Sequence, residues 1–210
     1  MRLYKFSDKV IRVQGNAAQF LNGLTANALD KPRNAFVNLH GRIIATVWQE
    51  RISDDEMLLA VPVVAVDALL GHLNRYAKLS RSQLIATDLK AYMDLEEAKV
   101  IIQPDGAQPL VSEEEFTLFR LDRGIPLMGV DYQADEFILN VHEHDYVSYT
   151  KGCFLGQEPV AKVHNRSKPS WRLIVKYENE CSDEEKSKMT SKSRDPQSGG
   201  FKGFVFVKNV

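Results

Sequence analysis

The first half of the chain shows two hydrophobic periods, one typical of strands and the other of helices. Val10–Val13 is a short, mainly apolar run that predicts a strand. Four apolar residues then follow at the i, i+3, i+4 and i+7 spacing of one helix face: Ala17, Phe20, Leu21 and Leu24. Asn16 stands directly before them and is a residue type that favours the N-cap position, and Gly23 marks the expected end of this helix.

Alternating apolar segments continue on both sides of His40-Gly41, a dipeptide suited to the turn of a β-hairpin. A polar turn at 53–56 then precedes another strand, and a helix-period segment follows it. The expected elements are strands at 34–39, 42–48 and 57–61, a helix at 64–76, and three strands between residues 79 and 103.

The next segment carries clear helix-boundary signals. Ser112 and Glu115 have the spacing of a capping box, in which each side chain binds the other residue's backbone N–H. The helix that they open is expected to run to Asp122, because Gly124 suits the residue after a helix and Pro126 prevents continuation.

The C-terminal part predicts little regular structure. Strands are expected at 172–177 and 203–207, and the polar segment 179–200 between them is expected to be a mobile loop. Across the whole chain, single helices alternate with groups of strands. This order favours an α+β fold over a doubly wound parallel sheet.

Bulk properties narrow the class of protein. The chain has 210 residues, enough for one compact body with sub-lobes, and its 44% hydrophobic and 26% charged content is ordinary for a globular protein. A formal net charge of −1 argues against a general nucleic-acid binder. With no long apolar run and no N-terminal signal pattern, we expect a cytoplasmic protein without a membrane partner. Two cysteines cannot ligate a zinc ion or an iron–sulfur cluster alone, so no metal site is expected.

The segment Thr150–Pro159 concentrates functional groups in a shaped loop that leads into a helix from Val160 onward. Two glycines allow unusual backbone geometry, and Pro159 suits the first turn of a helix. Cys153 follows Lys151 closely and precedes the expected helix start. A cation and a helix N-terminus both favour a thiolate, so Cys153 is either an activated thiol or an inert packed cysteine.

Other candidates surround this loop. Gln157 and Glu158 either bind a flat heterocycle through an amide and a carboxylate, or hold the loop's own backbone. A basic run follows and either meets an anionic ligand or is a solvated strand edge. Its members are Lys162, His164, Arg166, Lys168 and Arg172.

Residues 151–158, Lys-Gly-Cys-Phe-Leu-Gly-Gln-Glu, resemble the K-G-C-[YF]-x-G-Q-E motif of the YgfZ-type folate-binding proteins, relatives of the glycine cleavage system T-protein. Further segments are similar to that family in the right order between about residue 10 and residue 175. They are Arg12–Gly15 with Phe20–Thr25, Asn38–Ile43, Arg75-Tyr76 with Leu79–Ser82, and Arg120 with Gly124–Pro126.

The resemblance implies a T-protein-like α+β fold with two lobes around a central cavity. Residues 1–165 would form this folate-binding region, with its second lobe at roughly 50–110. Residues 166–210 would form a small C-terminal lobe, a truncated β-barrel, containing the mobile 179–200 loop.

The resemblance also implies a function. Family members bind tetrahydrofolate and support the assembly or repair of iron–sulfur clusters in client enzymes, including support of tRNA modification. Cys153 would be the functional thiol and Asp122 a pterin contact. The remaining folate-binding positions would be Lys151, Gly156, Gln157, Glu158, Lys162, Arg166 and Arg172. The expected partners are folate and iron–sulfur client enzymes or cluster carriers.

Two alternatives remain open. The first is a folate-dependent aminomethyltransferase, although residues 37–52 lack the aspartate that T-proteins use there. The second is an RNA partner, which rests on the basic run alone. In addition, Lys162 stands where the family usually has arginine, which weakens bidentate carboxylate binding at that position. Because residues 37–52 lack that aspartate, we expect a binding factor rather than an enzyme.

Overall fold

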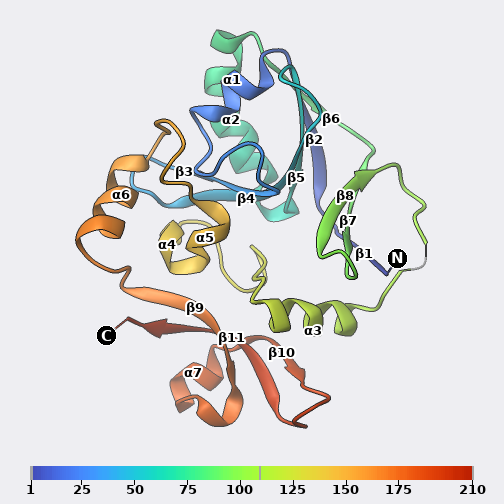
Figure 1. Ribbon diagram of the computed structural model, residues 1–210, viewed down its shortest axis with the longest axis vertical. Coiled ribbons are helices and arrows are strands. Elements are labelled where there is room, and N and C mark those ends of the chain that lie inside the picture. The colour runs from blue at the N-terminus through green and yellow to red at the C-terminus, as the bar shows by residue number, and fades with distance from the viewer. Residues whose placement is uncertain (1, 109, 210) are drawn as a thin grey trace.

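The computed structural model describes residues 2–108 and 110–209, whose strands form three antiparallel sheets (Figure 1). A five-stranded sheet has the order β3-β4-β5-β2-β6, and two three-stranded sheets have the orders β1-β7-β8 and β10-β11-β9. The strands are β1 (Leu3–Lys5), β2 (Lys9–Gln14), β3 (Arg33–Val37), β4 (Ile43–Arg51), β5 (Glu56–Val61), β6 (Gln83–Ala86), β7 (Lys90–Asp94), β8 (Lys99–Gln103), β9 (Trp171–Tyr177), β10 (Thr190–Arg194) and β11 (Phe201–Lys208).

Both faces of the five-stranded sheet are buried. In β5, Met57, Leu59 and Val61 point into a core with the helices at 17–22 and 66–80, because side chains alternate across a strand. Leu58 and Ala60 point the other way, into a second core with β7 and the helix at 113–123. The uninterrupted apolar run of β5 follows from this double coverage.

Helices pack around the three sheets (Figure 1). They are α1 (Ala17–Asn22), α2 (Val66–Ser80), α3 (Glu113–Arg123), α4 (Ile138–Val141), α5 (Glu143–Tyr146), α6 (Gln157–Arg166) and α7 (Asp183–Ser187), with short 3-10 turns η1 (Val63–Ala65) and η2 (Glu178–Glu180). The predicted hairpin, the three strands between residues 79 and 103, and the helices at 64–76 and up to Asp122 are all confirmed, with ends shifted by a few residues.

Two predicted helix caps differ from the structure. Asn16 adopts a left-handed conformation (φ 47°) and its side chain does not cap α1. The turn at Asp54 and Asp55 accepts the N–H groups there instead: Asp55 Oδ1 from Asn16 at 3.0 Å and Asp54 O from Ala18 at 2.8 Å. Ser112 does cap α3 by accepting from Glu115 N–H at 3.2 Å, but the Glu115 carboxylate pairs with Arg2, so only half of the capping box forms.

The polar segment 179–200, expected to be a loop, is largely ordered into secondary structure. It contains α7 and β10, and Ser182 and Glu185 form a full capping box at the start of α7. Its polarity reflects a short exposed helix and an edge strand rather than a lack of structure. Together with β9 and β11 it forms an open three-stranded sheet, where the sequence predicted a truncated barrel.

Candidate functional site

Residues 151–156, the motif loop that precedes α6, are hydrogen-bonded to the connection between α1 and β3. The Lys151 ammonium donates to three backbone carbonyls, those of Asn22 at 2.8 Å, Thr25 at 2.6 Å and Asn27 at 3.1 Å. Leu155 N–H also donates to Gly23 O at 2.9 Å. These bonds join segments more than 120 residues apart in the chain.

Lys151 therefore has a structural role that the sequence did not suggest. Burial lowers the pKa of its ammonium to about 8, and its hydrogen-bond partners are carbonyl and hydroxyl oxygens rather than a carboxylate. The Lys151 ammonium is surrounded by backbone oxygens of the α1–β3 connection. Of the two activating features that the sequence suggested for Cys153, the Lys151 charge is thus engaged elsewhere, whereas α6 begins at Gln157, nearer to the thiol than the expected start at Val160.

We expect Lys151→Met to lower the free energy of unfolding by about 2 kcal/mol, because three carbonyls lose their charged donor. Urea denaturation measures the change. Lys162→Met is the matched control, since Lys162 is exposed on α6 and such surface changes usually stay within about 0.5 kcal/mol. Equal midpoints for the two variants would contradict the anchoring role.

Gly156 brings the motif loop against the β3–β4 turn. It has a φ of 82°, and a Cβ atom there would lie 2.2 Å from Asn38 O. From the other side, a Cβ at Gly41 would lie 2.8 Å from side-chain atoms of Phe137 and Val160. The two glycines thus permit the hairpin turn and the start of α6 to pack backbone to backbone.

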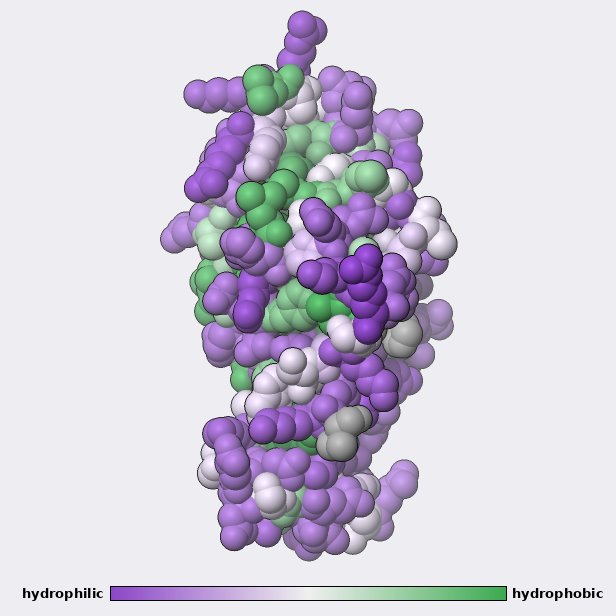
Figure 2. All heavy atoms as spheres, turned by 90° about the vertical axis from the view of Figure 1, so that its left-hand side faces the viewer, coloured by the Kyte–Doolittle hydropathy of each residue, from purple (hydrophilic) through white to green (hydrophobic). Residues whose placement is uncertain are grey.

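The remaining motif and basic residues lie on the surface around α6. Cys153 carries a free, exposed thiol. Gln157 and Glu158 form the first turn of α6, Lys162 and Arg166 are exposed farther along it, and Arg172 is exposed on β9. The face that carries α6 is mainly hydrophilic, with apolar side chains visible between the polar ones (Figure 2).

Asp122 lies apart from this group. It sits near the end of α3, and its carboxylate accepts from the ammonium of Lys202 on β11 at 2.6 Å. The Asp122 side chain is 57% exposed, whereas Lys202 is 9% exposed. The pair links α3 to the C-terminal sheet, which gives Asp122 a partner within the protein.

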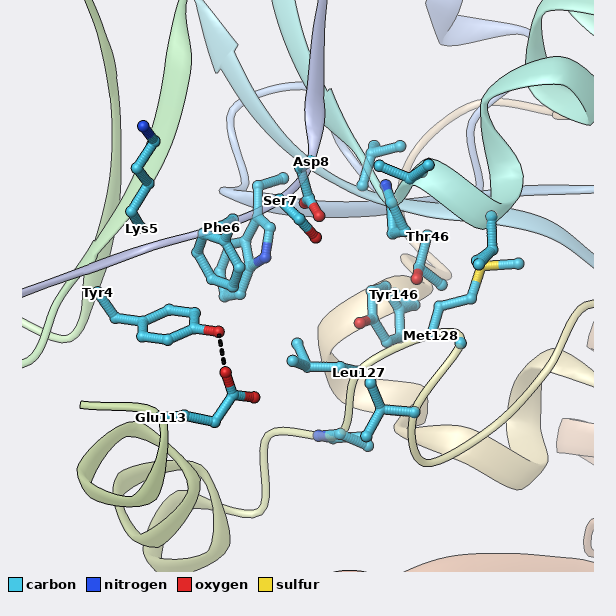
Figure 3. Close-up of a pocket in the computed structure, with 18 residues that line it drawn as sticks. Tyr4, Lys5, Phe6, Ser7, Asp8, Thr46, Glu113, Leu127, Met128 and Tyr146 are labelled. Atoms are coloured by element: carbon cyan, nitrogen blue, oxygen red, sulfur yellow. Dashed lines mark hydrogen bonds between the residues drawn. The ribbon is translucent and has the colours of Figure 1, made fainter. Parts of the chain in front are cut away.

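A cavity of about 540 Å³ lies between the two N-terminal sheets and α3 (Figure 3). None of the predicted site residues lines it. Its walls come from the segment between β1 and β2, from β4, from the start of α3 and from the loop after α3. The lining residues used below are Tyr4, Phe6, Asp8, Trp48, Glu113 and Tyr146.

Asp8 is the unusual polar group of this cavity. Its carboxyl group points into the space between the Tyr4–Glu113 pair and Tyr146 (Figure 3). Burial raises the pKa of Asp8 to about 7. The residue keeps some accessible surface and is one of the residues that line the cavity.

Aromatic side chains form much of the remaining wall. Tyr4 stacks on Phe116 with ring centroids 3.8 Å apart, and its hydroxyl donates to Glu113 Oε2 at 3.2 Å. Burial, with the charge of Glu113, raises the pKa of Tyr4 to about 12. On the opposite side, Arg33 lies over the rings of Trp48 and Tyr146 and donates to the Tyr146 hydroxyl at 2.5 Å. Both walls are therefore held by specific contacts.

A second depression of about 980 Å³ is larger, but it is a surface groove lined mostly by polar residues. Asn38, Arg42, Asp135, Lys168 and Trp171 are among them. The smaller cavity combines aromatic walls with a buried carboxyl group, so it is the better candidate for a small-molecule site.

No protein-family model matches the sequence. Among solved structures, the glycine cleavage system aminomethyltransferase T from Bartonella henselae is similar, with a TM-score of 0.77 and 15% sequence identity. The match covers 99% of this chain and 78% of that chain. The chain has the fold of aminomethyltransferase T. This confirms the predicted α+β class and the relationship to that fold, and at this identity it assigns no residue a role.

Within the aminomethyltransferase T fold, the sequence missed the cavity residues Asp8, Tyr4 and Glu113. Glu113 is easily interpreted as helix-start charge, because it occupies the first turn of α3. For Asp8 the sequence offers one signal: its carboxylate stands between Phe6 and the apolar run that begins at Val10.

Membrane-spanning helices and metal-binding groups were sought among the described residues. No helix among them is long and apolar enough to cross a membrane. The same residues contain no group of three or more His, Cys, Asp or Glu side chains placed to hold a metal ion.

Proposed function

We propose that the protein binds a reduced folate, tetrahydrofolate or a close relative, in the 540 Å³ cavity and acts as a YgfZ-type accessory protein for iron–sulfur enzymes. The observation that carries the proposal is the combination, in one cavity of this fold, of aromatic walls and a carboxyl group that no cation among the described residues neutralises. A folate supplies a carrier for one-carbon groups, and the protein's residues bind and orient it.

The cavity suits such a ligand in size and chemistry. Its volume lies within the range of about 300–1,000 Å³ that is usual for small-molecule sites. Tyr4, Phe6 and Trp48 provide flat apolar surface for a heterocycle. Asp8 and Glu113 provide oxygen acceptors for its N–H groups, whereas uncharged aromatic walls alone would not fix its orientation.

Cys153 would serve the iron–sulfur clients from outside the cavity. Its thiol is exposed on a loop that Lys151 and Gly156 hold in place. Lys162, Arg166 and Arg172 are exposed on the following helix and strand, where they can meet carboxylates of a client protein. This arrangement supports a binding and presenting role for the thiol.

Cys153→Ala tests this role in cells that depend on the protein. We expect the activity of iron–sulfur client enzymes to fall several-fold, because the exposed thiol is lost, while reduced-folate affinity measured by calorimetry stays unchanged. Cys181→Ala is the matched control, since Cys181 is 7% exposed and remote in sequence from the motif loop. Full client activity with Cys153→Ala would overturn the iron–sulfur part of the proposal and leave folate binding intact.

Aminomethyl transfer is the second candidate, and Asp8 favours it. General acid–base catalysis works best with a group that titrates near the operating pH, and the pKa of Asp8 is raised to about 7 by burial. Incubation with tetrahydrofolate and an aminomethyl donor should then yield methylenetetrahydrofolate. Absence of that product at high protein concentration would exclude the transferase.

A further inference from the structure

We propose that Asp8 is the group that recognises the cavity's ligand: its ionised oxygens accept N–H groups from an aminopyrimidine-type edge, and binding releases a proton. The ligand class, a pterin-like heterocycle, rests on the proposed function. The role of Asp8 rests on its position in the cavity and on its lack of a partner, and nothing in the fold comparison assigns it.

Asp8 is held in place by the sheets on either side of it. It lies between β1 and β2, which belong to two different sheets. Phe6 N–H is bound to Ala91 O at 3.0 Å and Thr87 N–H to Val10 O at 3.1 Å, so the short crossing is held at both ends. A carboxyl group on such a segment is presented by two rigid sheets rather than by a free loop.

The hydrogen-bonding capacity of the Asp8 carboxyl group is unused within the described residues. Neither a hydrogen bond nor an ion pair engages the Asp8 carboxyl group within the part of the chain that the structure describes. Two other carboxylates, by contrast, are engaged: Asp105 with Lys5 and Tyr92, and Glu113 with Tyr4. Asp8 therefore keeps its full acceptor capacity for a group that enters the cavity.

The charge of the Asp8 carboxyl group changes with pH near neutrality. Burial alone raises the pKa of Asp8 from 3.8 to about 7, so near neutral pH the free protein holds a proton there about half the time. A ligand that donates N–H groups interacts best with the ionised form. Binding must then lower the pKa of Asp8 and expel the proton, as linkage requires.

The other titratable groups of the cavity wall have partners within the protein. The pKa of Tyr4 is raised to about 12, and Lys5, paired with Asp105, has its pKa raised above the ordinary lysine value. Tyr146 is bound by Arg33, and Glu113 is an exposed carboxylate on the first turn of α3. No histidine is among the described residues that line the cavity.

The ligand's edge follows from the acceptor. An ionised carboxylate offers two oxygens in one plane, which match two parallel N–H donors. A 2-amino-4-oxo-pyrimidine ring presents such a pair, the ring N–H and the exocyclic amine. Tyr4, Phe6 and Trp48 then offer faces against which the flat ring can pack.

Calorimetric titration with 5-formyltetrahydrofolate and with free pterin, at pH 8.0 and pH 5.5, tests the inference. Below the free-protein pKa of about 7, affinity should fall about tenfold per pH unit, which gives a roughly 30-fold weaker Kd at pH 5.5. Paired buffers of different ionisation enthalpy should report proton release. Asp8→Asn should weaken binding at pH 8.0 at least tenfold and remove the pH dependence, whereas Asp88→Asn, exposed and outside the cavity, should match the wild type.

The outcomes separate the two proposals. If the folate binds with the same pH profile in wild type and Asp8→Asn, the role of Asp8 is wrong and folate binding stands. If pterin binds with the expected profile and the folate does not, Asp8 is supported and the folate proposal fails. If neither ligand binds, both are overturned.

A measurement without ligand confirms that the variant folds. The folded-state pKa of Asp8 is raised, so the unfavourable effect of its charge is absent below pH 3.8 and complete above about pH 7. Asp8→Asn should therefore melt at a higher temperature than the wild type at pH 8, and the difference should narrow at pH 5. A variant that melts lower at pH 8 would show that the carboxylate has a stabilising partner, contrary to the inference.

Discussion

Replacing Arg120 with Met is expected to destabilise the folded protein by about 3–5 kcal/mol, because it leaves a buried carboxylate unpaired. Arg120 Nη1 donates to Asp131 Oδ2 at 2.7 Å, and the two side chains are only 3% and 0% exposed. Desolvating both charges has a large cost, which their attraction and added hydrogen bonds offset in the intact pair. Without the guanidinium, the Asp131 carboxylate stays buried away from water but no longer has its positively charged partner.

The loss should extend to the C-terminal sheet. Arg120 Nη2 donates to Ser191 Oγ at 2.8 Å, and Thr190 and Ser191 hydroxyls donate to Asp131 Oδ1 at 2.9 and 2.5 Å. The pair thus connects α3 and the following loop to β10. Amide hydrogen exchange in β10 should accelerate in Arg120→Met more than in β5 of the central sheet.

Urea unfolding of three variants tests the assignment. Arg123→Met is the matched control, since Arg123 is exposed on the same helix and only packs over the Phe119 ring at 4.2 Å. The double variant Arg120→Met with Asp131→Asn should recover part of the stability, because the unpaired charge is gone. A midpoint for Arg120→Met equal to that of Arg123→Met would refute the importance of the pair.

Gly156→Ala is expected to lower the free energy of unfolding by about 2–4 kcal/mol. The positive φ of 82° disfavours any side chain, and the new Cβ would lie 2.2 Å from a backbone oxygen that cannot rotate away. Relief requires the hairpin turn and the start of α6 to separate. The motif loop should then become more accessible to proteases.

The same motif contains its own control. Gly152, four residues earlier, has no positive φ, and a Cβ atom there would meet no neighbouring heavy atom within 4 Å. Gly152→Ala should therefore change stability by less than about 0.5 kcal/mol. Equal destabilisation of both variants in urea would mean that the motif glycines act through chain flexibility, not through the contact with Asn38.

Much of the fold could be predicted because its signals are local. The strand-period segments of β3 to β5 and the Gly124–Pro126 stop after α3 were sufficient to place those elements. The segment 179–200 was missed because its polar composition outweighed the capping box at Ser182 and Glu185: its helix packs on β11 and has no apolar face of its own. Composition alone cannot distinguish an exposed short helix from a loop.

The candidate site was less predictable because distant residues create it. Lys151 looked like a neighbour of Cys153, yet its partners are at positions 22 to 27. Asp8 acquires its character from walls contributed by β4, by α3 and by the loop after α3. No spacing rule connects residue 8 to those segments, so only the folded chain reveals the environment of its carboxyl group.

The strand order of the central sheet has a consequence for how the protein is made. β2 leaves the ribosome before β5 and β6, the two strands between which it lies in the sheet. Its hydrogen-bonding groups and apolar side chains must wait until residue 86 has been synthesised, and β1 waits longer for β7. A nascent chain of this topology exposes these strands until their partners have been synthesised, and such unpaired apolar strands are the kind of surface that chaperones protect.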